Sequence, residues 1–288
     1  MQNRTDLAVE SFEESGKTKL NGVIVKEGNG ITCVSVISRD GERRLGKPMG
    51  RYITVEVPSF VNDADIFDGR LHKIAAILKN LLPPDCDNIL VVGLGNMDIT
   101  ADALGPKTGS YIFATRHISN SLRKEMGFEN LKTVSCVCTG VLGETGIESA
   151  EIIKGVASVV KPSCVIAVDA LAATSAKRLG TTVQLSSSGI VPGSGVGNHR
   201  FEISEKTLGV PVVSIGIPTV ICASDISGSA DDSMFVTPRE IDRLTEQGAK
   251  LIGMSINVCL QSGISERDLY ALVAVSYTHL RAHETSQD

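Results

Sequence analysis

The sequence lacks several features that would assign it at once to a class of protein. It contains no run of about 18 apolar residues, so it predicts no membrane span. It has no basic block, and its formal net charge is −5, which argues against a protein that itself coats nucleic acid. Its first residues show no basic and then apolar signal pattern. We therefore expect a cytoplasmic protein with no direct nucleic-acid or membrane partner.

Cysteine offers little support for a disulfide framework or a metal site. The seven cysteines are scattered singly, apart from Cys136 and Cys138. Their odd number, without a secretion signal, predicts free thiols in a reducing compartment. Cys136 and Cys138 lie in an apparent strand, where alternation points both side chains to one face. We expect these two to pack against the core rather than to bind a metal.

The chain has enough apolar residues for one large α/β domain, with 42% hydrophobic residues in a length of 288. From residue 65 onward, strand-like and helix-like segments alternate, which predicts a central, mostly parallel sheet with helices on both faces. Before them, strand-like runs and a turn at Gly28–Gly30 predict a β-rich N-terminal subdomain. The predicted strands are 20–26, 31–38, 52–57, 88–95, 133–138, 164–171, 183–186 and 212–217, and the predicted helices are 65–82, 107–126, 148–160, 238–260 and 265–273.

The sequence Asp-Ala-Leu occurs twice, at Asp102–Leu104 and at Asp169–Leu171, and each Asp lies at or just beyond the end of an apolar run. Ligands and chemistry collect outside the carboxyl ends of strands in an open α/β sheet. Two carboxylates that converge there could activate water. A lone Asp after a strand is usually a helix cap or turn residue, so each also has a structural interpretation. That interpretation fits Asp169 less well, because an unpaired carboxylate beside four apolar residues would be costly.

Two glycine-rich stretches resemble known motifs but complete neither. Gly93–Asn96 follows a strand, yet it lacks the third glycine of a dinucleotide-binding fingerprint. Gly193–Gly197 has a glycine where a nucleophile elbow has its central serine. We therefore expect no cofactor. The surrounding stretch Ser186–Asn198 predicts a solvated loop, and beside an active site such a loop could bind extended peptide through its backbone.

An ordered set of short stretches resembles the germination proteases of peptidase family A25, the spore endopeptidases that degrade small acid-soluble spore proteins. No single stretch is decisive, but the ordered set is specific and covers nearly the whole chain. The matching stretches are Arg4–Glu10, Gly46–Pro58, Val92–Asn96, Asp102–Pro106, Thr115–His117, Thr145–Glu148, Asp169–Ala173, Gly189–Asn198 and Gly216–Val220.

The resemblance implies a function and a set of site residues. Asp102 and Asp169 would be the catalytic pair, acting without a metal or cofactor on small acid-soluble spore proteins in the spore core. The protein would be a homotetramer made as a zymogen. Its cleavage between Asp6 and Leu7 would release a propeptide of residues 1–6 from a single catalytic domain of residues 7–275. Residues 276–288 resemble a translated sequencing adapter, and we exclude them from the fold.

A second resemblance offers an alternative of another kind. A Gly-Leu-Gly-Asn turn, then an acid, then a strand that ends in Asp is similar to the hydrogenase maturation proteases, which share this fold type. In that interpretation Asp102 and Asp169 would face a metal, with His117 or His199 as a third group, although neither histidine lies in a matching motif. A non-enzymatic scaffold is the third possibility.

Overall fold

The computed structural model describes residues 5–60, 65–125, 127–128, 130–196, 201–227 and 234–274. Residues 1–4 of the expected propeptide, His199 and the tail 276–288 lie outside these ranges. Within them, nine strands form one sheet in the order β1-β2-β3-β7-β8-β6-β4-β5, with β9 paired to β8. The α/β fold class is therefore as predicted.

The centre of the sheet is parallel and its N-terminal side is antiparallel. Strands β8, β6, β4 and β5 pair in parallel, whereas β1, β2, β3 and β7 extend the sheet in antiparallel pairs. Short apolar runs buried on both faces favour the parallel arrangement. The strands are β1 Val23–Gly28, β2 Ile31–Val36, β3 Gly50–Glu56, β4 Asn88–Gly93, β5 Thr133–Cys138, β6 Cys164–Ala173, β7 Thr182–Ser186, β8 Val212–Cys222 and β9 Phe235–Val236.

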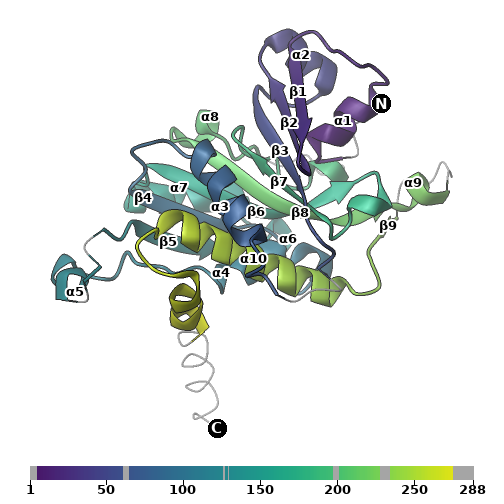
Figure 1. Cartoon of the computed structure of the whole chain (residues 1–288). Coiled ribbons are helices and arrows are strands. Elements are labelled where there is room, and N and C mark those ends of the chain that lie inside the picture. The colour runs from purple at the N-terminus through teal and green to yellow at the C-terminus, as the bar shows by residue number, and fades with distance from the viewer. Residues whose placement is uncertain are drawn as a thin grey trace.

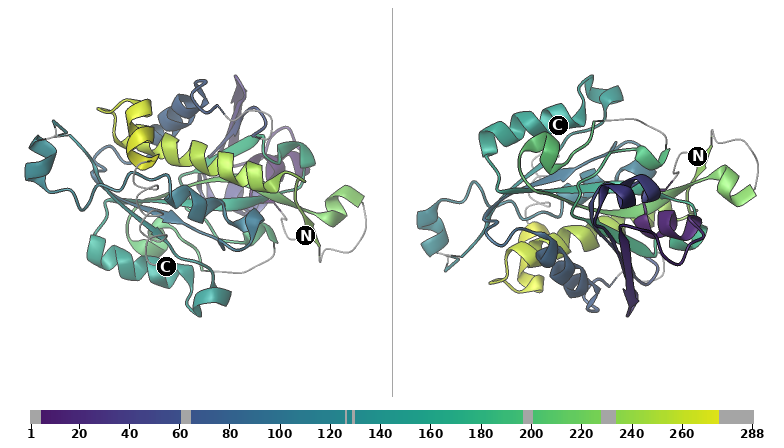
Figure 2. Two further views of the ribbon diagram at one scale, coloured as in Figure 1. Left: turned by 90° about the horizontal axis from the view of Figure 1, so that it is seen from below. Right: turned by 90° about the horizontal axis from the view of Figure 1, so that it is seen from above.

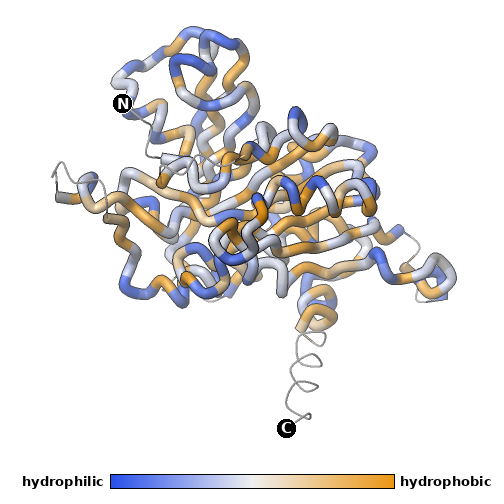
Figure 3. The backbone as a smooth tube through the Cα atoms, turned by 180° about the vertical axis from the view of Figure 1, so that it is seen from behind, coloured by the Kyte–Doolittle hydropathy of each residue, from blue (hydrophilic) through white to orange (hydrophobic). Residues whose placement is uncertain are grey.

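Helices cover both faces of the parallel strands (Figures 1 and 2). Helix α10 packs with α3 and α4 on one face, and α7 lies on the other. The tube in Figure 3 is mostly orange in the central strands, where these layers meet. The helices are α1 Ala8–Glu14, α2 Arg39–Leu45, α3 Arg70–Leu81, η1 Thr100–Asp102, α4 Leu104–Gly109, α5 Asn120–Glu125, α6 Leu142–Thr145, α7 Ser149–Val160, η2 Ala176–Arg178, η3 Ser194–Val196, α8 Glu205–Leu208, α9 Ala223–Ser227 and α10 Ile241–Leu260, with a further helix at 266–274. Among the described residues, no helix is long and apolar enough to span a membrane.

The N-terminal subdomain is β-rich, as predicted, and stands on one end of the sheet (Figure 1). It contains β1, β2, β3, α1 and α2. The turn between β1 and β2 has positive φ angles at Asn29 and Gly30, 53° and 66°, which suit a two-residue hairpin. Its small core includes Leu7, and Leu171 and Ala173 of β6 belong to the same cluster. The subdomain is therefore fixed directly on the carboxyl end of β6.

The predicted helix 107–126 is wrong. The structure has two short helices there, α4 and α5, separated by irregular chain. In that chain the backbone N–H groups of Thr115 and Arg116 both donate to the carbonyl of Val134, at 2.9 and 3.0 Å. These tertiary hydrogen bonds to β5 replace the helical ones. A local sequence pattern cannot predict them, because they depend on how the chain folds back onto the sheet.

The expectation of free thiols is wrong for one pair, because Cys86 and Cys164 form a disulfide. Cys86 precedes β4 and Cys164 begins the neighbouring strand β6, and this pairing brings their Cα atoms to 6.3 Å. Cys136 and Cys138 lie against α4, with their sulfurs facing the carbonyls of Gly109 and Pro106. Cys136 is partly buried and packs against the core, as predicted, whereas Cys138 is exposed.

Candidate active site

The site lies where strand β6 runs beyond its neighbour β4. The last β4 residue paired to β6 is Gly93, opposite Val168, whereas β6 continues alongside β8 to Ala173. Because these strands are parallel, the overhang lies at the carboxyl end of the sheet, where α/β proteins bind ligands. Asp169 is the first residue of the overhang.

Asp169 is a buried carboxylate, with only 4% of its surface exposed. Alternation places it on the same face as Ala167, which packs in the cluster with α7. The backbone N–H of Ala170 donates to its Oδ1 at 2.9 Å. In register with Asp169 are Gly216 on β8 and then Gln184 on β7. The glycine has no side chain, and the side chain of Leu171 packs over it, since a Cβ there would lie 2.8 Å from Leu171 Cγ.

Asp102 ends the short helix η1 and holds the loop that follows β4. Its Oδ2 accepts a hydrogen bond from the Asn96 N–H at 2.7 Å. The Thr219 hydroxyl of β8 donates to the Ala101 carbonyl at 2.7 Å and ties the same turn to the sheet. Gly95 has a φ of 112°, and a Cβ there would lie 2.0 Å from the main-chain oxygen of Asp102. Only glycine fits at that position. Asp102 thus makes a hydrogen bond that holds the turn, as its structural interpretation predicts.

Asp102 and Asp169 line the same cavity, which has a volume of about 470 Å³. A third acid on its wall is Asp6, from the N-terminal segment. The neighbouring residue Leu7 has no exposed surface. The structure thus brings together the two strand-end aspartates and the acid of the predicted propeptide bond, which are far apart in the sequence.

The main chain around Asp6 is bound to two strands of the sheet. Its N–H donates to the carbonyl of Ala172 on β6 at 2.9 Å. Its carbonyl oxygen accepts from Nε2 of Gln184 on β7 at 2.9 Å. The Oε1 of the same glutamine accepts from the N–H of Ala8 at 2.9 Å. One buried amide therefore holds the chain on both sides of the Asp6–Leu7 bond.

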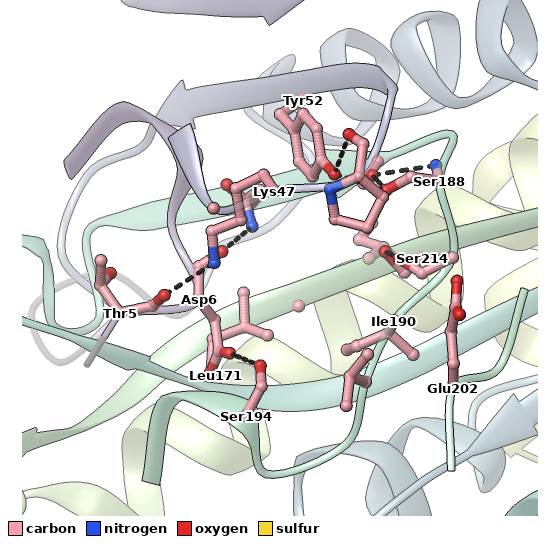
Figure 4. Close-up of a pocket in the computed structure, with 18 residues that line it drawn as sticks. Thr5, Asp6, Lys47, Tyr52, Leu171, Ser188, Ile190, Ser194, Glu202 and Ser214 are labelled. Carbon is pink, nitrogen blue, oxygen red and sulfur yellow. Dashed lines mark hydrogen bonds between the residues drawn. The ribbon is translucent and has the colours of Figure 1, made fainter. Parts of the chain in front are cut away.

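A smaller cavity of about 190 Å³ adjoins the first at Asp6 (Figure 4). Lys47 donates from Nζ to the Thr5 carbonyl at 2.7 Å. Burial lowers the pKa of Lys47, and the nearby Asp6 and Glu10 carboxylates oppose that shift. Burial also raises the pKa of Tyr52 to about 12. A lysine and an un-ionised phenol thus line this side of the N-terminal segment.

Glu10 anchors the start of α1 to the chain that leaves β6. It is 2% exposed, and its carboxylate accepts from the N–H groups of Thr174 at 2.8 Å and Ser175 at 3.0 Å. Arg178 forms an ion pair with it at 3.4 Å. The hydroxyl of Thr5 also donates to it. These contacts fix the N-terminal segment to the chain that follows β6.

Of the two histidines in the metal-binding alternative, His199 lies outside the described residues, and His117 gains no support. His117 is exposed, and it follows the two residues that bind the Val134 carbonyl near the amino end of β5. The cavity lies at the carboxyl end of these parallel strands. Among the described residues, no group of three or more His, Cys, Asp or Glu side chains is arranged to hold a metal ion.

Sequence reasoning missed Gln184 and Lys47. Gln184 lies between Val183 and Leu185, with Thr182 and Ser186 beyond them, an alternation that is ordinary in a strand and carries no signal of function. Lys47 carries no signal either, because a lysine next to Pro48 fits an ordinary surface turn. The loop after β7 was expected to be solvated, with peptide binding through its backbone as a second possibility, and the Gly195 N–H of that loop donates to the side-chain carboxylate of Asp6.

A family model described as germination protease, of peptidase family A25, matches residues 3–235. Germination proteases of three bacteria are similar over most of their length. That of Caldanaerobacter subterraneus subsp. tengcongensis is 39% identical, over 94% of this chain and 98% of the relative. That of Clostridium perfringens is 34% identical, over 92% and 97%, and that of Priestia megaterium is 41% identical, over 85% and 70%. Among solved structures, the [NiFe] hydrogenase maturation protease HycI from Thermococcus kodakarensis KOD1 matches 63% of this chain and 99% of its own, with 20% identity and a TM-score of 0.38.

Proposed function

The chain belongs to the germination protease family and is a peptidase, and from that premise we propose that Asp102 and Asp169 activate water for peptide-bond cleavage. One observation carries the proposal. Asp6, which precedes the predicted cleavage bond, lines the same cavity as both aspartates. A peptide segment of the chain itself thus lies beside the two carboxylates.

The chemistry follows from two carboxyl groups in one site. They cannot both ionise without cost, so one keeps its proton. The ionised member takes a proton from water as the water attacks the carbonyl carbon. The protonated member hydrogen-bonds the carbonyl oxygen and then protonates the leaving nitrogen. Such a pair titrates as a unit.

Gln184 supports the same mechanism from the substrate side. Its Nε2 donates to the carbonyl oxygen of Asp6, which belongs to the predicted cleavage bond. During attack, that oxygen gains negative charge, and a fixed donor pointed at it stabilises the transition state. Because Oε1 is held by the Ala8 N–H, the amide group has one orientation.

We further propose that the protein is a zymogen, cut between Asp6 and Leu7. Residues 1–6 would form the propeptide, and residues 7–275 the catalytic domain. Asp6 and the hydroxyl-bearing Thr5 lie on the overhang of β6, so the segment blocks the edge that an extended substrate would use. Removal of the segment would open that edge.

The substrates, assembly and location follow from the family. We propose small acid-soluble spore proteins as the substrates, a homotetramer as the assembly and the spore core as the location. No metal, cofactor, nucleic acid or membrane takes part in the proposed reaction.

The test is a cleavage assay with a purified small acid-soluble spore protein. Asp102→Asn and Asp169→Asn should each lower turnover by at least ~100-fold, because an amide cannot act as a general base. Asp98→Asn is a matched control, since Asp98 is an exposed acid in the loop of Asp102 and outside the cavity lining. A variant that is folded by circular dichroism and keeps near-native turnover would remove its residue from the catalytic pair.

A chelator separates this proposal from the metal-binding alternative. Activity that survives complete metal removal supports the aspartate pair. Activity that is lost with the metal and returns with it supports the alternative. No cleavage under any condition favours a scaffold.

A further inference from the structure

The carboxylate of Asp6 lies in a cradle of three hydrogen-bond donors, of which Figure 4 draws Ser194. The hydroxyl of Ser194 donates to Oδ1 at 2.5 Å, and the Gly195 N–H donates to the same oxygen at 3.0 Å. The Ala172 N–H donates to Oδ2 at 2.8 Å. Both carboxylate oxygens are therefore bound, by groups from two separate segments of the chain.

The cradle suits a carboxylate better than the amide of the same shape. Backbone N–H groups can only donate. An NH2 group in place of one carboxylate oxygen would face such a donor, and neither of the two would have an acceptor. A site built to bond a particular polar group discriminates strongly against an analogue that leaves its donors unpaired. Charge-assisted hydrogen bonds of this kind are also about twice as strong as neutral ones.

The shape of the cradle depends on a glycine. A Cβ on Gly195 would lie 2.5 Å from Oδ2 of Asp6 and 2.6 Å from the Cβ of Ala172. Any larger residue would occupy the space that the carboxylate fills. The close approach of backbone to ligand is therefore built into the loop sequence.

The main chain of the same residue is held in the manner of a bound peptide. The Asp6 N–H and carbonyl bind Ala172 and Gln184, as described above. A substrate chain that followed the same path would place its own side chain in the cradle. Lys47 lies nearby and donates from Nζ to the carbonyl of the preceding residue, Thr5, at 2.7 Å.

We propose that Ser194, Gly195 and the Ala172 N–H form the subsite for an acidic side chain on the amino side of the bond to be cut. In the intact chain Asp6 occupies this subsite, and in a protein substrate an Asp or Glu does so. This inference rests on the proposed protease function and deepens it, because it names the residues that select the substrate.

The experiment compares two synthetic peptides. One has the sequence of residues 3–12 of this chain, and the other has Asn in place of its Asp. The full chain, after incubation in mildly acidic buffer, should cleave the acidic peptide with a kcat/KM at least about tenfold above that of the amide peptide. Ser194→Ala should lower this ratio about tenfold, and Ser194→Thr, which keeps a hydroxyl, should retain part of it.

Gly195→Ala should reduce cleavage of the acidic peptide, because the new Cβ fills the cradle. Ser187→Ala is the matched control, since Ser187 is an exposed serine of the same loop that accepts from Arg51. Equal cleavage of both peptides by the unaltered chain, or an unchanged ratio in folded Ser194→Ala and Gly195→Ala, would overturn the subsite and leave the protease function standing. Cleavage of neither peptide nor of a spore protein would overturn the function itself.

Discussion

At the scale of single residues, the proposed mechanism gives Gln184 the most demanding role after the two aspartates. Gln184 is buried, with 7% of its surface exposed. Its side-chain Nε2 donates to the carbonyl of Asp6, and its Oε1 accepts from the N–H of Ala8. A buried amide whose two ends are both satisfied cannot rotate without losing a hydrogen bond. It therefore presents a donor of fixed direction to the carbonyl of the proposed cleavage bond.

Gln184→Glu tests that role. The substitution keeps the acceptor for the Ala8 N–H and replaces the donor to Asp6 with an oxygen. We expect kcat for the residue 3–12 peptide to fall ~100-fold or more, with a smaller change in KM. Gln261→Glu is the control, because buried Gln261 bonds in the same two-ended way to Lys132. Equal effects on kcat from both substitutions would show that the amide of Gln184 is only structural.

The sequence identified some of these residues and not others. Asp102 and Asp169 were selected because each is an acid at the end of an apolar run, a local pattern. The contribution of Gln184 depends on β7 lying next to β8 and two strands from Asp169. That order is set by tertiary pairing, so no local pattern could reveal it. The Asp6–Leu7 position came from family resemblance, and its contacts came from the structure.

At the scale of elements, the loop between β4 and η1 controls where Asp102 points. It closes through the Asn96 N–H and depends on Gly95 for its close approach to Asp102. A non-glycine residue at this φ is strained, and here it would also clash with backbone. The loop is therefore a rigid support, and the aspartate it carries has a fixed direction.

Gly95→Ala should lower the free energy of unfolding by ~2 kcal/mol or more and reduce peptide cleavage. Gly143→Ala offers the opposite case, because Gly143 lies in the first turn of α6 with open space around it. A helical glycine replaced by alanine should leave stability equal or raise it by about 0.5 kcal/mol. Urea unfolding measures both. A Gly95→Ala variant as stable as the unaltered chain would contradict this account of the loop.

The elements also show where sequence periodicity stops being sufficient. The hairpin at Gly28–Gly30 and the strands β4, β5 and β6 were predicted closely, because turn chemistry and apolar runs are local. The helix expected at 107–126 is interrupted, and the chain there is held by the Arg123 side chain, which donates to the carbonyls of Thr115 and Leu131. Such side-chain to backbone bonds join residues that the helical period does not relate.

At the scale of the whole molecule, the N-terminal segment and the carboxyl end of the parallel strands form one unit. Leu7 of the segment and Leu171 of β6 belong to one hydrophobic cluster, and Glu10 binds the chain after β6. The carboxylate of Asp6 lies in the cradle of donors described above. The α/β class, with helices on both faces and a β-rich N-terminal part, was predictable from the order of elements. The docking of the segment was not, because it joins residues more than 160 positions apart.

In the mechanism that we propose, the aspartate pair cuts the bond after Asp6 in its own chain. The most direct test is the intact mass of the purified protein after incubation in mildly acidic buffer. The unaltered chain and Asp98→Asn should yield a species that begins at Leu7, whereas Asp102→Asn and Asp169→Asn should keep Met1. A form that keeps Met1 and is fully active, or processing at Leu7 by a purified Asp169→Asn chain, would contradict the account.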